Sequence, residues 1–249
     1  MERTRILRNS QIIILGMCIG LATIASSVIL SQGFMKIMKF TREVISVTGS
    51  AQQTIASDLA VWQVELARRG TDLPLAYREL ESDLSRVKAY LSLKGILPEE
   101  TVISQVLTTT LYKKTAEGYD TNEIEGQRLS QRITVRSHDV NRVAAVSRDI
   151  TELIKEGIYL TSLAPEYFYT KLDELKVEML ARATENAKQR AESMARSAGN
   201  RIGVIRSAKM GVFQITPPTS TEVSDYGEND TSSLEKKVMA VVSATFAIE

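Results

Sequence analysis

Hydrophobic residues are most concentrated near the start of the chain. Residues 11–30 form twenty consecutive positions without a charged side chain. A helix rises about 1.5 Å per residue, so this segment is long enough to cross the roughly 30 Å hydrocarbon core of a bilayer. Arg3, Arg5 and Arg8 come before it. Because positive charges beside a membrane helix stay in the cytoplasm, we expect residues 1–10 to be cytoplasmic. The body would then lie on the periplasmic side of the inner membrane.

Two interpretations of this apolar segment are open. A cleaved signal peptide has an apolar region of about 7–15 residues, followed by small residues at the cleavage site. The run here is longer, and Ala25-Ser26-Ser27 lies within it, which favours an uncleaved, single-pass anchor. We interpret Cys18, in the middle of the span, as a small apolar residue in lipid. Residues 31–42, with Lys36, Lys39 and Arg42, are predicted to be a basic linker.

The body, residues 43–249, contains several runs in which apolar and polar residues alternate, as they do in a half-buried strand. The cleanest run is 128–136, where Leu129, Ile133 and Val135 share one face and arginines share the other. The pattern also predicts strands at 44–51, 59–67, 101–112, 158–169, 201–215 and 234–248. Gly49-Ser50 is expected to form a turn that ends the first strand, and a polar turn is expected at 113–122.

Two segments have apolar residues every three or four positions, as in a helix packed on a sheet. In the first, which begins at Thr71-Asp72, this stripe is Leu73, Ala76, Leu80, Leu84, Val87 and Leu91. Four charged residues are predicted to face water: Arg78, Glu79, Asp83 and Lys88. In the second segment, 139–155, the stripe is Val143, Val146, Ile150 and Leu153. Gly95 and Gly157 follow these helices, as glycine commonly does at a helix end.

The longest predicted helix follows Thr170 and ends at Gly199. Thr170 and Asp173 have the spacing of an N-terminal cap, in which side-chain oxygens accept from free backbone N–H groups. Small residues recur at every fourth position: Ala183, Ala187, Ala191 and Ala195. Such a stripe lets a helix lie close to its own sheet, which is the interpretation we favour. The alternative is that the stripe meets another copy of the protein.

The order of these elements predicts an α+β fold with an antiparallel sheet and packed helices. Strand, helix, Gly-Ile and strand follow one another twice, in residues 59–111 and 129–169, which suggests a duplicated βαβ-type unit. Residues 216–233 are polar and aperiodic, so we expect a mobile loop or a hairpin arm. The strand at 234–248 is predicted to pair with the strand that follows Gly199.

Composition excludes several classes of function. The chain has 31 basic and 30 acidic residues, and this balance argues against nucleic acid as a partner because phosphate binding needs clustered Lys and Arg. One Cys and one His exclude an internal disulfide and argue against a Cys/His zinc site. No glycine pattern for binding phosphates occurs.

Candidate catalytic residues are few. His138 is the one general-base candidate with an ordinary pKa near neutrality. It lies where a strand meets a helix, so we interpret Ser137 or Asp139 as the helix cap and His138 as a surface residue. The acidic residues Glu222, Asp225, Glu228 and Asp230 lack the spacing of an EF-hand, and we interpret them as solvated charge. We therefore predict no catalytic, cofactor-binding or metal-binding residues, no cofactor and no enzyme activity.

Several short motifs, taken in their order, resemble the SIMPL-domain family of bacterial extracytoplasmic proteins. They are Val47-Thr48-Gly49-Ser50-Ala51, Ser57-Asp58-Leu59-Ala60, Gly95-Ile96, Gly118-Tyr119, Gly157-Ile158 and Ala198-Gly199-Asn200-Arg201-Ile202-Gly203. The resemblance covers about residues 43–249. Two departures are Ser57, where many relatives have Pro, and Lys209-Met210-Gly211, where relatives often have an acidic residue. Both bear on ligand binding more than on the fold.

The resemblance implies an α+β domain of paired βαβ-type units in the cell envelope. It also implies assembly into large ring-like or hollow homo-oligomers, a loose association with stress resistance and no established catalysis. Our leading expectation is therefore a membrane-anchored structural or interaction protein that forms a homo-oligomer. The alternative is a binding module that captures a small molecule or peptide in a groove between sheet and helix.

Overall fold

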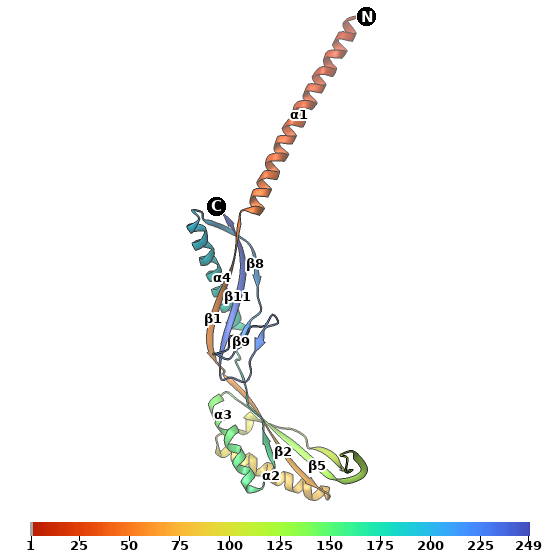
Figure 1. Ribbon diagram of the computed structural model, residues 1–249, viewed down its shortest axis with the longest axis vertical. Helices are drawn as coiled ribbons and strands as arrows, with labels where there is room; N and C mark the ends of the chain where they lie inside the picture. The colour runs from red at the N-terminus through yellow and green to blue at the C-terminus, as the bar shows by residue number, and fades with distance from the viewer. Residues whose placement is uncertain (1) are drawn as a thin grey trace. The chain divides into compact units, whose positions relative to one another are not determined.

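The computed structural model describes the backbone of residues 2–249 and the side chains of residues 15–35 and 43–249. The chain forms two compact units (Figure 1). Unit 1 comprises the described part of Met1–Ser50 together with Arg182–Gly211 and Val241–Glu249. Unit 2 comprises Ala51–Ala181 and Val212–Ala240. Helices and strands occur in both, which confirms the α+β class.

Helix α1 (Glu2–Arg42) contains the apolar segment. Within it, Leu15–Met35 is long and apolar enough to cross a membrane, and none of it is buried against the rest of the protein. By length and composition this fits an anchor and a signal sequence alike. The helix continues through residues 31–42, the predicted linker. The side chains of Lys36, Lys39 and Arg42, like those of the arginines before the span, lie outside the described ones.

The sheet of unit 2 is built around β2 (Leu59–Gly70) and β5 (Asp120–Ser137), which pair antiparallel from Ala60↔Ser137 to Gly70↔Gln127. On the other side of β5 lie β3 (Thr101–Ile103) and β4 (Leu107–Lys114). On the other side of β2 lie β6 (Leu160–Ser162) and β7 (Glu166–Phe168). All of these pairs are antiparallel, and the order is β3-β5-β2-β6.

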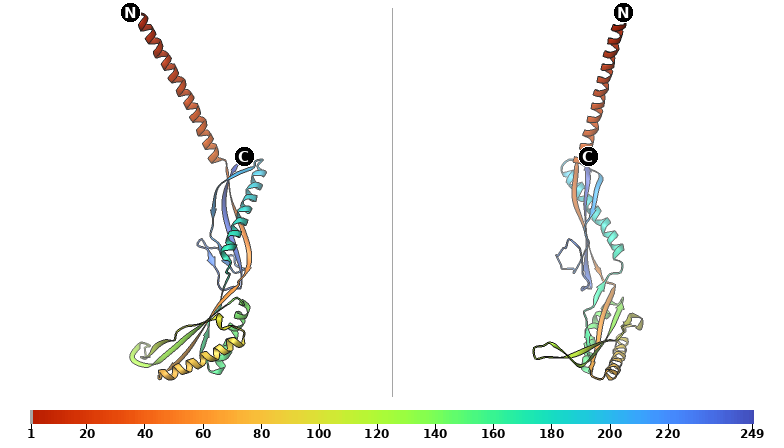
Figure 2. Two further views of the ribbon diagram at one scale, coloured as in Figure 1. Left: turned by 180° about the vertical axis from the view of Figure 1, so that it is seen from behind. Right: turned by 90° about the vertical axis from the view of Figure 1, so that its right-hand side faces the viewer.

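Two predicted strands are interrupted. The strand predicted at 101–112 breaks between β3 and β4, where Ser104 donates its backbone N–H to the Arg132 carbonyl. The strand predicted at 158–169 breaks between β6 and β7, next to Pro165, which has no N–H to donate to a ladder. The predicted turn at 113–122 is confirmed as the tip of the β4–β5 hairpin, which projects from the sheet (Figure 2).

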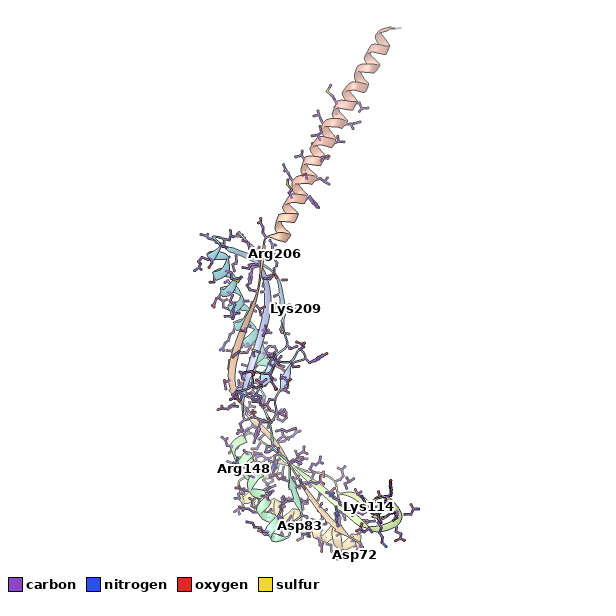
Figure 3. All side chains as sticks on the ribbon, in the orientation of Figure 1. Asp72, Asp83, Lys114, Arg148, Arg206 and Lys209 are labelled. Atoms are coloured by element: carbon purple, nitrogen blue, oxygen red, sulfur yellow. The ribbon has the colours of Figure 1, made fainter. Side chains whose placement is uncertain are left out.

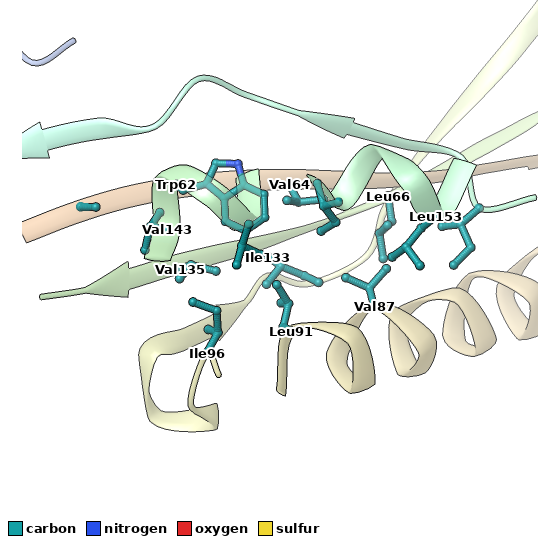
Figure 4. Close-up of a cluster of buried hydrophobic side chains, with 14 of the residues drawn as sticks. Trp62, Val64, Leu66, Val87, Leu91, Ile96, Ile133, Val135, Val143 and Leu153 are labelled. Atoms are coloured by element: carbon teal, nitrogen blue, oxygen red, sulfur yellow. The ribbon is translucent and has the colours of Figure 1, made fainter. Parts of the chain in front are cut away.

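One face of this sheet is covered by α2 (Leu73–Leu93), α3 (Val140–Asp149) and the 3₁₀ helix η2 (Ile150–Glu156). A short 3₁₀ helix, η1 (Pro98–Glu100), follows α2. The predicted inward residues meet in one core (Figure 4), which includes Trp62, Val64, Leu66, Val87, Leu91, Ile133, Val135, Val143 and Leu153. Leu73 is the exception: it lies at the start of α2 and is exposed, so its predicted inward position is wrong. The buried indole N–H of Trp62 donates to Ser162 Oγ at 3.0 Å, and Ser162 donates to the Ser147 carbonyl at 2.8 Å.

Strand β11 (Glu235–Ile248) lies at the centre of the second sheet, between β1 (Val44–Ala56) on one side and β8 (Ile202–Met210) and β9 (Gln214–Thr216) on the other. The antiparallel pairing of β8 with β11 confirms the predicted partner. The run predicted at 201–215 is divided into β8 and β9. The two-residue strand β10 (Glu228–Asn229) pairs parallel with β9, so this sheet is mixed.

Helix α4 comprises Leu172–Ser197, and its residues from Arg182 onwards belong to unit 1, where they pack closely on β1. Ala183, Ala187, Ala191 and Ala195 are buried, which confirms that the alanine stripe packs inside the protein. The turn predicted at Gly49-Ser50 is wrong, because β1 continues to Ala56. A Cβ at Gly49 would meet the Ala183 carbonyl and lie 2.7 Å from Ala187 Cα. The glycine is there because the helix backbone approaches the strand.

Residues 217–227, between β9 and β10, are held by specific contacts. The Gln214 side chain donates to the Ser224 carbonyl at 2.6 Å and accepts from the Ser224 N–H at 3.3 Å. The buried Lys236 donates to the Asp230 carbonyl at 2.5 Å, and Lys237 donates to the Ser220 carbonyl. The predicted mobile loop is therefore tied to β9 and β11, and we call residues 219–228 the acidic loop.

Candidate functional site

His138 is engaged in a structural contact. Its Nδ1 lies 2.7 Å from the Asp58 carbonyl oxygen. Asp139 caps α3 by accepting from the Arg142 N–H, and Ser137 Oγ accepts from the Asp139 N–H. The predicted capping at this corner is confirmed, and His138 is exposed as expected. The geometry ties the end of β5 to the start of β2.

Asp58 also fixes the segment that leads into α4. Thr170 donates its backbone N–H to Asp58 Oδ1 and its hydroxyl to Oδ2, both at 2.7 Å. The sequence predicted that the Thr170 hydroxyl caps the start of α4. In the structure this hydroxyl donates to Asp58. Burial acts to raise the pKa of Asp58, but the two hydrogen bonds from Thr170, a hydrogen bond from its own backbone and the charge of His138 together lower it.

The four acidic residues considered as a cation site behave differently from one another. Glu222, Asp225 and Glu228 are exposed. In Asp230, burial acts to raise the pKa, but hydrogen bonds from Ser232 and Ser233 and the charge of Lys236 lower it to about 2. In the described part of the chain, no group of three or more His, Cys, Asp or Glu side chains could hold a metal ion.

A buried ion pair was not predicted from the sequence. Asp83 on α2, labelled in Figure 3, accepts hydrogen bonds from Arg68 Nε at 2.5 Å and from a terminal nitrogen of Arg68 at 2.8 Å. Arg68 also donates to the Gly157 carbonyl at 3.0 Å. The prediction that Asp83 faces water is wrong. Arg68 occupies the next position in the inward-facing series of Trp62, Val64 and Leu66. This alternation along β2 is the sequence signal that could have revealed the pair.

Beside this pair lies a hollow of about 580 Å³, which we call the arginine groove. It is lined by Ala67, Arg68, Arg69, Glu79, Arg128, Ile154, Tyr159, Leu160 and Thr161. Its size falls within the range of small-ligand sites. Arg69 on β2 lies directly opposite Arg128 on β5. The Arg68 guanidinium lies over the Tyr159 ring, 5.2 Å from its centroid.

The groove lies where β2 has a free edge. The Ala67 N–H donates to the Tyr159 carbonyl, and the Leu163 N–H donates to the Gln63 carbonyl. Since alternate residues direct their backbone groups to the same edge, Arg69 directs its N–H and C=O there too. Among the described strands, β6 and β7 are the ones on this edge, and neither reaches Arg69.

In unit 1, the two outer edges of the sheet differ. At β1, the Ser50 N–H donates to Asn186 Oδ1 at 3.1 Å, and Arg190 donates to the Thr48 carbonyl at 3.0 Å. Helix α4 thus covers this edge with side chains. Strand β8 pairs with β11 alone among the described strands. It exposes Val204 (62%) and Met210 (56%). Lys209, labelled in Figure 3, lies on the same strand.

A comparison with family models decides the membership of the chain. Residues 45–246 match the SIMPL model, described as a protein of unknown function (DUF541). The chain belongs to the SIMPL family. The match confirms the resemblance and extends over both units.

Other comparisons add little to the SIMPL assignment. No curated protein matches the sequence. Among solved structures, the ligand-free regulatory subunit of aspartate kinase from Thermus thermophilus is similar at 11% identity and a TM-score of 0.19. The alignment covers 81% of this chain and 88% of that one. A likeness at this score carries no conclusion about function.

In this SIMPL chain, the residues that carry the resemblance have structural roles. Gly49 admits α4, and Asp58 binds Thr170. Gly95, Gly157 and Gly199 end helical segments with positive φ angles. These residues serve the fold. The arginine groove and the exposed strand β8 are therefore the candidate surfaces for binding a ligand or another protein chain.

Proposed function

We propose that this protein is a membrane-anchored, extracytoplasmic interaction protein that assembles into a ring-like or cage-like homo-oligomer. The observation that carries the proposal is strand β8, a nine-residue outer strand with exposed apolar side chains. An exposed edge of this kind is a template for pairing with another chain. A role in resisting envelope stress follows from the resemblance alone and is kept as part of the proposal.

The apolar span supports the anchoring part. Leu15–Met35 has the length and composition of a membrane helix, and the arginines before it favour a cytoplasmic N-terminus by the positive-inside rule. The body would then lie on the periplasmic side. Anchors in one membrane confine the copies to two dimensions and raise their effective concentration, so a weak contact between bodies suffices for assembly.

Symmetry favours a ring. Copies inserted in one membrane share their orientation, so a rotation axis along the membrane normal relates them. A contact between two different surfaces then repeats around the axis until the ring closes.

The repeated strand–helix order of unit 2 also supports the proposal that this unit consists of paired βαβ-type halves. Strands β2 and β3 flank β5, while β5 and β6 flank β2.

The test is the native mass of the full-length protein, extracted from membranes in a mild detergent, followed by electron microscopy. We expect a defined species of many copies. The variant Val204→Lys should reduce its population, because a charge on the exposed face of β8 must be desolvated in any contact there. Wild-type protein that remains monomeric at micromolar concentration would overturn the proposal.

A second candidate function is capture of a small molecule or peptide without catalysis, and the arginine groove favours it. A ligand that binds the folded state raises the melting temperature in a saturable manner. A thermal-shift screen that yields such a ligand, with no oligomer present, would support this function.

We also propose that the protein is not an enzyme. The contact of His138 with the Asp58 carbonyl supports this proposal. A catalytic activity abolished by His138→Ala would contradict it.

A further inference from the structure

Among the residues that line the arginine groove, three are arginines, Arg68, Arg69 and Arg128, and one, Glu79, is acidic. Arg69 and Arg128 lie directly opposite each other on β2 and β5, and like charges in this position destabilise a sheet. Glu65 lies 3.3 Å from Arg128 but also 3.6 Å from Arg132, so one carboxylate serves two guanidinium groups. No described residue forms an ion pair with Arg69. A carboxylate from outside would relieve this repulsion.

The same groove has an apolar wall. Tyr159 is 68% exposed and Ile154 is 51% exposed, although both are large hydrophobic residues. Ala67 lies between Arg69 and Glu65 on the same face of β2, and its small side chain leaves the hollow open. The groove therefore suits an occupant that combines a carboxylate with an aromatic or aliphatic side chain.

The acidic loop presents this combination of groups. Glu222, Asp225 and Glu228 are exposed, and between them Val223 is 68% and Tyr226 96% exposed. The loop is held in place by the two hydrogen bonds between Gln214 and Ser224 and by the Tyr226 N–H, which donates to Ser224 Oγ at 3.2 Å. A fixed loop loses little conformational entropy on binding, and tyrosine is enriched among residues that dominate binding energy.

We propose that the acidic loop of one copy docks in the arginine groove of a neighbouring copy. Asp225 or Glu222 would pair with Arg69 and Arg128, and Tyr226 would pack against Tyr159 and Ile154. Within one copy, no hydrogen bond or ion pair joins the described residues of the loop to those of the groove, so both surfaces are available. The inference rests on the proposed self-assembly and names one of its contacts.

Both surfaces lie in unit 2, at different places on it. A contact between two different surfaces is heterologous, so each copy gives its loop to one neighbour and receives the loop of another. This is the type of contact that a closed ring requires.

The experiment is a charge swap in the full-length protein in mild detergent. Arg69→Glu sets two negative surfaces against each other, and Asp225→Lys sets two positive ones. Each variant alone should self-associate at least about tenfold more weakly, because like charges placed against each other oppose association. An equimolar mixture should assemble again, since each loop then meets a groove of opposite charge. The double variant should assemble by itself.

Controls separate charge pairing from loss of folding. Arg69 has no ion pair to lose within its own chain, and Glu at this position faces Arg128, so the melting temperature should be equal to or above the wild-type value. Arg136→Glu changes the charge of an exposed residue on β5 that does not line the groove. The native mass of its oligomer should equal that of the wild type.

The outcomes are distinguishable. A monomeric wild type overturns the proposed assembly itself. An oligomeric wild type whose mass is unaffected by both variants overturns this contact and leaves assembly in place. If Arg69→Glu disrupts assembly but Asp225→Lys does not, the groove binds another anionic group, and the acidic loop is not its occupant.

Discussion

At the residue scale, the pair of Arg68 and Asp83 joins three elements of unit 2. Asp83 lies on α2, Arg68 on β2, and Arg68 also binds the carbonyl of Gly157, which ends η2. Hydrogen bonding to Asp83 raises the pKa of Arg68, so the guanidinium remains charged at any physiological pH. The largely buried positive charge of Arg68 therefore needs the carboxylate of Asp83 as its partner.

Asp83→Ala should destabilise the protein by about 2–3 kcal/mol, because it leaves the largely buried guanidinium of Arg68 unpaired. The measurement is the free energy of unfolding by urea. The matched control is Arg86→Ala on the same helix, which removes the exposed pair with Glu156 and should cost at most about 0.5 kcal/mol. Equal effects of the two variants would contradict the assignment of Asp83 as a buried partner.

Asp230 gives a prediction for acid pH. Its pKa is about 2 in the folded state against 3.8 in the unfolded chain. The unfolded chain therefore takes up this proton first as pH falls, so the stabilisation is complete above pH 3.8 and is lost on approach to pH 2. Between pH 5 and 2 the wild type should lose about 2 kcal/mol more stability than Asp230→Asn. Asp225→Asn, at an exposed position, should follow the wild type, and parallel curves for all three proteins would refute the role of Asp230.

At the scale of elements, the contact of β1 with α4 depends on residues without bulk. Gly49→Ala should destabilise unit 1 by about 2 kcal/mol or more, since the added Cβ would overlap the Ala187 backbone and force the helix from the strand. Circular dichroism during heating would measure this. Thr48→Ala, one residue away and exposed, is the control and should melt near the wild-type temperature. If Gly49→Ala melted there as well, the close approach would be disproved.

Local patterns predicted most elements but could not reveal every partner. The stripe of α2 and the alternation of β5 are properties of neighbouring residues, and both were confirmed, except that Leu73 at the start of the stripe is exposed. Gly49 was assigned to a turn because a glycine that admits a helix and a glycine that turns the chain look alike in sequence. Asp83 was assigned to the surface because its partner is fifteen positions away on another element. The arginine groove was missed for the same reason, since its lining residues come from β2, β5, β6, α2 and η2.

At the scale of the whole molecule, an apolar span precedes two units with different surfaces. Unit 1 has one covered sheet edge and one exposed edge, and unit 2 has a basic groove and an acidic loop. The family match spans both units but gives no activity. The native mass of the full-length protein and the charge swap therefore decide which of these surfaces meet a neighbour.

The side chains of Asn186 and Arg190 on the outer edge of β1 have a consequence for growth. A polymer that extends by strand addition needs every new unit to offer a fresh acceptor edge. Here the backbone groups of Thr48 and Ser50 are already satisfied by α4, so a chain that pairs through β8 offers no second edge at this site. Strand addition therefore cannot continue through this part of the β1 edge. The cover on β1 removes one route to fibre formation, even though each chain carries the exposed strand β8.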